Sequence, residues 1–118
     1  MANRHLRTPV RYAGSMPFIQ SQGARIYFRV VEPRDGGAAA EPLVLLHGFT
    51  ASSLTNWEYP GLVAALSATN RLVLIDFRGH GKSAKPLRAR AYSRAILAAD
   101  VIAVMDRLAV PRARVFGY

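Results

Sequence analysis

The sequence contains no cysteine among its 118 residues. This absence excludes disulfide bonds and thiolate metal sites, and it is compatible with a reducing compartment. The first twenty residues include Arg4, Arg7 and Arg11 but no apolar run that could form the core of a signal peptide. No segment reaches the roughly 20 apolar residues that a membrane-spanning helix needs. We therefore expect a cytoplasmic protein that does not associate with membranes.

Acidic residues are also scarce, because only 7 Asp and Glu oppose 16 Lys and Arg and leave a net charge of +9. A balance this basic raises the question of nucleic-acid binding. The basic residues are spread along the chain, however, and they do not alternate with aromatic residues as a stacking platform requires. We expect no specific nucleic-acid site, no cofactor and no metal.

The remaining composition is that of a folded domain, with 51% apolar and 19% charged residues. Residues 1–17 are polar, basic and interrupted by Pro9, Gly14 and Pro17, which predicts a flexible lead-in. Residues 18–118 contain the apolar patterns and are predicted to form the folded part.

The stretch Leu43–Phe49, written Leu-Val-Leu-Leu-His-Gly-Phe, is the centre of this pattern. Its four apolar residues predict a short strand that is buried on both faces. The strand ends in His47-Gly48-Phe49, where the glycine allows a sharp turn that exposes backbone N–H groups. Such a turn can hold a developing negative charge, although an ordinary strand-to-loop turn has the same pattern.

The elements expected around this strand alternate between strands and helices. Ser21-Gln22-Gly23 predicts a hairpin turn, the glycine-rich loop 76–83 follows a second buried strand, and Ser93 is a candidate helix cap. In chain order we expect strands over Phe18–Gln20 and Ala24–Val31, a short helix that includes Trp57 and Tyr59–Leu66 with Leu62, Val63 and Leu66 on its buried face, a strand over Arg71–Asp76, a helix to about Leu108 with Leu97, Val101, Val104, Met105 and Leu108 on one stripe, and a strand from Val115. This order predicts βαβ units and a parallel sheet covered by helices.

Two features of the loop 76–83 resemble known motifs without matching them. A phosphate-binding loop needs glycine where Asp76 stands. A nucleophile elbow around Ser83 needs glycine where Lys85 stands. We therefore interpret Ser83 as part of a capped surface turn and His80 as structural. Asp76 and Arg78 either pair to fix the loop or form a solvated charge pair.

Three blocks taken together resemble the α/β-hydrolase family. These are His47-Gly48-Phe49, the block Asp76-Phe77-Arg78-Gly79-His80-Gly81-Lys82-Ser83, and Val115-Phe116-Gly117-Tyr118, and they occur in the family's order. The resemblance covers about Phe18 to Tyr118 and implies the N-terminal portion of an α/β-hydrolase domain. The implied fold is α/β, a partial α/β-hydrolase sheet with an N-terminal hairpin followed by parallel βαβαβ.

The resemblance also implies a site. If Gly117 is the first glycine of the family's Gly-x-Ser-x-Gly elbow and Tyr118 the variable position, this sequence stops one residue before the nucleophile. The backbone N–H of Phe49 would donate to the oxyanion, Gly48 would place it, and His47 would be a hydrogen-bonding strut of the turn. The implied function is a serine hydrolase that cleaves an ester-like bond of a small molecule. The 118-residue chain, which lacks nucleophile, acid and triad histidine, is expected to be inactive.

Two alternatives remain open. The nucleophile could be an aspartate, as in the epoxide hydrolases and haloalkane dehalogenases of the same family. The chain could also be a non-catalytic binding or structural module. The residues that follow Tyr118 would separate these alternatives.

Overall fold

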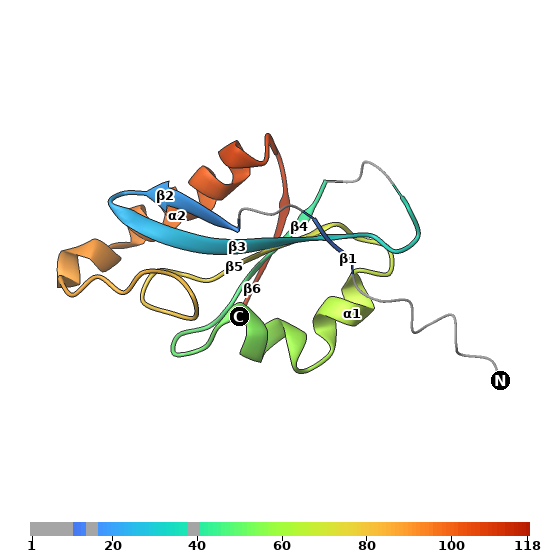
Figure 1. Ribbon diagram of the computed structural model, residues 1–118, viewed down its shortest axis with the longest axis horizontal. Coiled ribbons are helices and arrows are strands. Elements are labelled where there is room, and N and C mark those ends of the chain that lie inside the picture. Colours follow the sequence, from blue (N-terminus) through green and yellow to red (C-terminus); the bar gives the residue numbers. More distant parts are fainter. Residues whose placement is uncertain (1–10, 14–16, 38–40) are drawn as a thin grey trace.

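The computed structural model describes residues 11–13, 17–37 and 41–118, and these form one sheet with helices on both faces (Figure 1). The sheet order is β1-β3-β5-β4-β6, and β2 pairs with β3 off this path. The strands are β1 (Arg11–Ala13), β2 (Phe18–Ser21), β3 (Ala24–Glu32), β4 (Leu43–Leu46), β5 (Leu72–Ile75) and β6 (Arg114–Gly117). The expected hairpin followed by parallel βαβαβ is confirmed, because β4 pairs in parallel with both β5 and β6.

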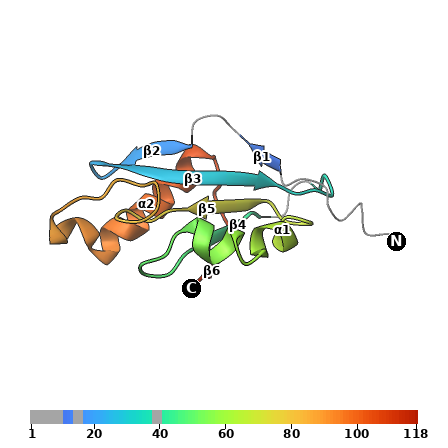
Figure 2. The ribbon, with the colours of Figure 1, turned by 60° about the horizontal axis from the view of Figure 1, so that its bottom comes forward.

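The hairpin of β2 and β3 is closed by the two residues Gln22 and Gly23, with φ of 46° and 76°. Positive φ at both positions is the mark of a type I′ turn, whose twist matches that of the strands it joins. At the other end of β3, β1 pairs antiparallel with Val30–Glu32 (Figure 2). The sequence did not predict β1, which falls within the expected lead-in. The lead-in residues 1–10 and 14–16 lie outside the described residues.

Alternate residues of the central strands pack into two separate apolar layers. Val73 and Ile75 of β5 face one layer together with Val44, and Leu72 and Leu74 face the other together with Leu45. Every residue of β5 is buried. The expectation that β4 is covered on both faces is therefore confirmed.

The two layers are covered by helices that lie on opposite faces of the sheet. The chain moves from β4 to its neighbour β5, and then from β5 back across β4 to β6. Because crossovers between parallel strands are right-handed, two crossovers in opposite directions place their helices on opposite faces. The π-helical turn η2 (Leu54–Glu58) and α1 (Leu62–Leu66) cover one face, and α2 (Arg94–Arg107) covers the other (Figure 1).

The first helical segment differs from the expectation of one helix that includes Trp57 and Tyr59–Leu66. It begins earlier, at Leu54, and it is divided because Gly61 adopts a left-handed conformation with φ of 88°. Val63 is buried as expected, whereas Leu62 is 38% exposed. The large side chain in this layer is that of Trp57, which was expected in the helix but not on its buried face.

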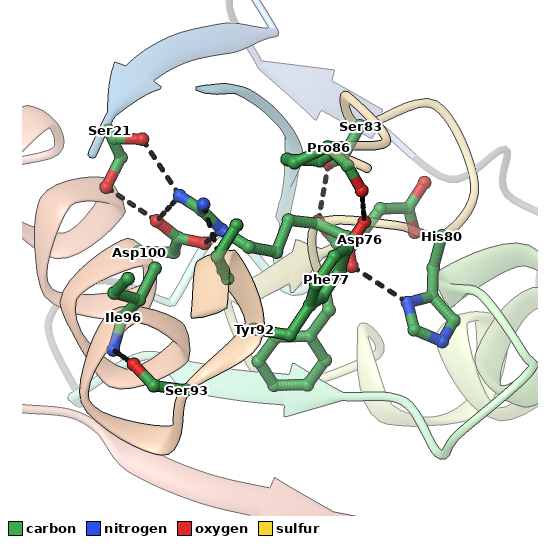
Figure 3. Close-up of polar contacts among 12 residues, drawn as sticks. Ser21, Asp76, Phe77, His80, Ser83, Pro86, Tyr92, Ser93, Ile96 and Asp100 are labelled. Carbon is green, nitrogen blue, oxygen red and sulfur yellow. Dashed lines mark hydrogen bonds and ion pairs between the residues drawn. The ribbon is translucent and has the colours of Figure 1, made fainter. Parts of the chain in front are cut away.

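Helix α2 begins as predicted, since the Ser93 hydroxyl accepts the Ile96 N–H at 3.2 Å. Its expected apolar stripe is only half-buried apart from Val104, and the stripe also contains Asp100, which is completely buried. The Asp100 carboxylate accepts two hydrogen bonds from Arg78, from Nε at 2.7 Å and Nη2 at 2.9 Å, and one from the Ser21 hydroxyl at 2.7 Å (Figure 3). Arg78 therefore pairs with Asp100 and not, as considered above, with Asp76.

This buried pair joins three parts of the chain that are distant in sequence. Arg78 follows β5, Asp100 belongs to α2, and Ser21 ends β2. Two further donors of Arg78 are also used, because its Nη1 donates to the Ala91 carbonyl and its Nη2 to the Ser21 carbonyl. A buried ion pair is stable only when its other hydrogen-bonding positions are satisfied in this way.

We predict that Asp100→Asn lowers the free energy of unfolding by about 3–5 kcal/mol, because it leaves the Arg78 guanidinium buried without a counter-charge. Urea denaturation followed by circular dichroism measures the change. Asp106→Asn, at an exposed position of the same helix, is the matched control and should change stability little. An Asp100→Asn variant as stable as the control would show that the pair does not hold α2 on the sheet.

Candidate active site

The candidate site lies where the strand order reverses, at the carboxyl ends of β4 and β6. In open α/β sheets, ligands bind in the crevice formed at such a switch point. The predicted residues meet here: the Tyr118 N–H donates to the Leu46 carbonyl at 3.1 Å, and the Tyr118 ring lies against Gly48. A Cβ at Gly48 would lie 2.7 Å from Tyr118 Cδ1, so any larger residue there would push the Tyr118 ring aside. Gly117 and Tyr118 thus stand directly beside the turn that follows β4.

Residues 47–50, which we call the β4 loop, form a tight turn with a free backbone donor. The Gly48 carbonyl accepts the Ala51 N–H at 3.1 Å, and Thr50 has a positive φ of 64°. In a β-branched residue this conformation is a steric outlier that costs about 1–2 kcal/mol. Within the described part of the chain, the Phe49 N–H has no hydrogen-bond acceptor. Phe49 as a residue is 88% exposed.

His47 fastens the β4 loop to the strand end of β5. Its Nε2 accepts the Phe77 N–H at 3.0 Å, so the proton lies on Nδ1, which donates to the Gly48 carbonyl at 2.8 Å. Burial lowers the pKa of His47 from the ordinary 6.5, against the opposing effects of the Gly48 carbonyl and Asp76. His47 is therefore a neutral strut, with both ring nitrogens occupied by the backbone.

Two further side chains hold the same loop. The Asn56 Oδ1 accepts the Gly48 N–H at 2.7 Å, and His80 Nε2 accepts the Thr50 N–H at 3.2 Å. Asn56 was not singled out from the sequence, because nothing in a polar Ser- and Thr-rich loop distinguishes an amide that reaches across the turn. His80 was considered structural, but its contact with Thr50 was not foreseen.

Residues 76–83, which we call the β5 loop, are folded around the Asp76 carboxylate. Asp76 accepts the Ser53 N–H at 2.8 Å and the Lys82 N–H at 3.0 Å. A Cβ at Gly81, where φ is 52°, would overlap this carboxylate, which explains the glycine. Ser83 is buried and not part of a surface turn as expected. Its hydroxyl donates to the Asp76 carbonyl (Figure 3) and accepts the Tyr27 N–H.

The β4 and β5 loops enclose an open cleft of about 590 Å³. The exposed Phe49 ring lies edge-on to the His80 ring, with 6.0 Å between the centroids. Tyr92, whose hydroxyl donates to the Pro86 carbonyl at 2.6 Å, forms the opposite wall and was not predicted from the sequence. The cleft is lined by Phe49, Thr50, Ala51, Gly79, His80, Gly81 and Tyr92.

Neither a metal centre nor a membrane span is found in the ranges that the structure describes. No group of three or more His, Cys, Asp and Glu side chains there could hold a metal ion. None of the helices there has the length and apolar character to cross a bilayer.

A doubly wound sheet with its loops gathered at a switch point defines an α/β protein with a ligand site at the carboxyl edge of its strands. Residues 41–118 match the alpha/beta hydrolase fold. The chain therefore belongs to the α/β-hydrolase family, and the resemblance seen in the sequence is confirmed.

Individual relatives are similar over most of this chain. The acetyltransferase component of the acetoin cleaving system of Pseudomonas putida is 37% identical over 83 residues, which cover 70% of this chain and 21% of that protein. Epoxide hydrolase B of Mycobacterium tuberculosis is 34% identical over 100 residues, which cover 85% of this chain and 27% of that protein. The crystal structure of the enol-lactonase from Burkholderia xenovorans LB400 superposes with a TM-score of 0.72 at 33% identity. The superposition covers 86% of this chain and 36% of the lactonase chain. The chain thus spans between a fifth and just over a third of these relatives.

We predict that the protein loses stability in acid through His47. Because the pKa of His47 is lower in the folded protein than in the unfolded chain, unfolding takes up a proton. The free energy of unfolding should therefore fall as the pH is lowered from about 7.5 to about 5.5, through the unfolded value near 6.5. Denaturation curves at both pH values measure the change.

The matched variant is His47→Gln, which keeps an acceptor for the Phe77 N–H but cannot titrate. Its stability should depend less on pH over the same interval. An unaltered pH dependence in this variant would contradict the assignment to His47.

Proposed function

We propose that this chain forms the oxyanion side of the active site of a serine hydrolase that cleaves an ester-like bond in a small molecule. The observation that carries the proposal is the free N–H of Phe49. This donor stands at the switch point of the sheet, beside Gly117 and Tyr118.

Acyl transfer develops negative charge on the carbonyl oxygen of the substrate, and a fixed backbone donor stabilises that charge without reorganisation. Loss of one such donor in known enzymes costs about 2.7–4 kcal/mol of transition-state stabilisation. The β4 loop suits this role because Asn56, His47 and His80 fix its backbone before any substrate binds. In the proposed reaction a serine attacks the carbonyl, and a second N–H, on the residue after that serine, completes the oxyanion hole.

Two relatives bear on the choice of nucleophile. The enol-lactonase is named for a lactone, which is a cyclic ester, and its similarity supports acyl-bond cleavage. Epoxide hydrolase B supports the second candidate, an aspartate nucleophile that opens an epoxide. The ending Phe116-Gly117-Tyr118 looks more like the serine type, so the serine is the nucleophile we propose.

The coding sequence downstream of Tyr118 tests this choice. We expect a serine codon immediately after that of Tyr118 and a glycine codon two positions later, which completes Gly-x-Ser-x-Gly. An aspartate codon in the serine position would replace the proposal with the epoxide-hydrolase candidate. A stop codon would instead favour a non-catalytic binding module.

We predict that the purified 118-residue chain neither hydrolyses short-chain p-nitrophenyl esters nor reacts with a fluorophosphonate probe. None of its serines stands in an elbow, and Ser83 is buried with its hydroxyl hydrogen-bonded to the backbone. Mass spectrometry of the chain after incubation with the probe measures labelling, and Ser83→Ala is the matched control. Stoichiometric labelling would place a reactive serine within these residues and contradict the proposed nucleophile.

A further inference from the structure

The β4 loop contains one residue whose conformation requires an explanation. Thr50 has a φ of 64°, although it is β-branched and no glycine-like freedom is available to it. The hydrogen bond between the Gly48 carbonyl and the Ala51 N–H places Thr50 at the third position of a four-residue turn, where a type II turn requires a positive φ and glycine is the usual residue. A left-handed non-glycine residue persists when its surroundings fix it, and such residues gather at functional sites.

The contact that fixes Thr50 comes from His80. His80 Nε2 accepts the Thr50 N–H at 3.2 Å, and the His80 ring also packs near the His47 ring, with 5.0 Å between the centroids. The neighbouring Phe49 N–H, on the same turn, has no acceptor among the described residues. One amide of the turn is thus held by a side chain while the adjacent amide is left free.

His80 is itself held by a backbone carbonyl of the β5 loop. Its Nδ1–H donates to the Arg78 carbonyl at 3.0 Å, and this assigns the tautomer that leaves Nε2 able to accept. Arg78 in turn is fixed by Asp100 through the buried ion pair. The result is a continuous set of contacts from α2 through the β5 loop to Thr50.

We infer that His80 is a positioning residue for the oxyanion donor: by holding the Thr50 N–H it keeps the β4 loop in the turn that leaves the Phe49 N–H without an acceptor among the described residues. The inference rests on the proposed function, which assigns the Phe49 N–H the role of an oxyanion donor. It requires no proton transfer by His80, since both of its ring nitrogens are engaged with the backbone.

Two substitutions separate this role from a general structural one. A glutamine amide reaches the position of Nε2, so His80→Gln retains an acceptor for Thr50 and loses the bond to the Arg78 carbonyl. An asparagine amide reaches the position of Nδ1, so His80→Asn retains the bond to Arg78 and loses the bond to Thr50. If His80 acts through Thr50, glutamine should preserve the loop and asparagine should not.

The measurement is residue-resolved amide exchange and chemical shift in the ¹⁵N-labelled full chain. We expect the Thr50 amide to exchange roughly tenfold faster in His80→Asn, as the loss of one hydrogen bond implies, with a shift of the Phe49 amide resonance. His80→Gln should retain the exchange rate and the Phe49 shift of the unaltered chain. Exchange at Leu45 in β4, which contacts neither His80 nor Thr50 through an observed hydrogen bond, controls for the stability of the sheet.

The inference would be overturned if the Thr50 amide exchanged at the same rate in the two variants. It would also be overturned if only His80→Asn kept the exchange rate of the unaltered chain. In the unaltered chain, a through-hydrogen-bond coupling between the Thr50 amide nitrogen and His80 Nε2 should be detectable. Its absence would overturn the inference even if a variant fails to fold. These readouts involve no chemical step, so they are independent of which nucleophile follows Tyr118. A serine elbow together with a negative result here would remove the role of His80 and leave the proposed function standing.

Discussion

The buried ion pair of Arg78 and Asp100 is the interaction on which the arrangement of this chain depends. Here α2, the β2 hairpin and the loop after β5 meet through charge-assisted hydrogen bonds, and both partners are almost fully excluded from solvent. Removing two charges from water is expensive, and the further hydrogen bonds with Ser21 and Ala91 offset part of that cost.

The Arg78–Asp100 pair is connected to the candidate site through a short series of hydrogen bonds. The Arg78 carbonyl sets the tautomer of His80, and His80 contacts the turn after β4. The reversal of strand order brings that turn beside Tyr118, at the edge where α/β proteins bind ligands. Helix packing on one face and loop geometry at the strand ends are therefore connected through a few polar contacts. A substitution in α2 can alter the β4 loop without touching it.

The sequence predicted the elements whose signals are local. The Gln22-Gly23 turn, the buried run of β4 and the Ser93 cap each depend on neighbouring residues, and each was found where expected. What it could not predict were contacts between distant segments. Arg78 has an acidic residue two positions away, yet it pairs with Asp100 because the loop turns Asp76 toward the amides of Ser53 and Lys82. Nor could periodicity show that the π-helical turn at Leu54–Glu58 would place Trp57 in the core.

The two histidines of the described residues illustrate how the same contacts limit the chemistry. His47 and His80 each accept a backbone N–H at Nε2 and donate from Nδ1 to a backbone carbonyl, so neither has a nitrogen left for a substrate. Protonating His47 would expel the Phe77 N–H that its Nε2 accepts and would loosen the link between the β4 loop and the end of β5. A general base of the proposed reaction must therefore be another group, because a histidine cannot both hold this turn and exchange protons with a nucleophile. The chain combines an unpaired backbone donor with side chains whose ring nitrogens are occupied by the backbone, which suits a site that stabilises charge and leaves proton transfer to other residues.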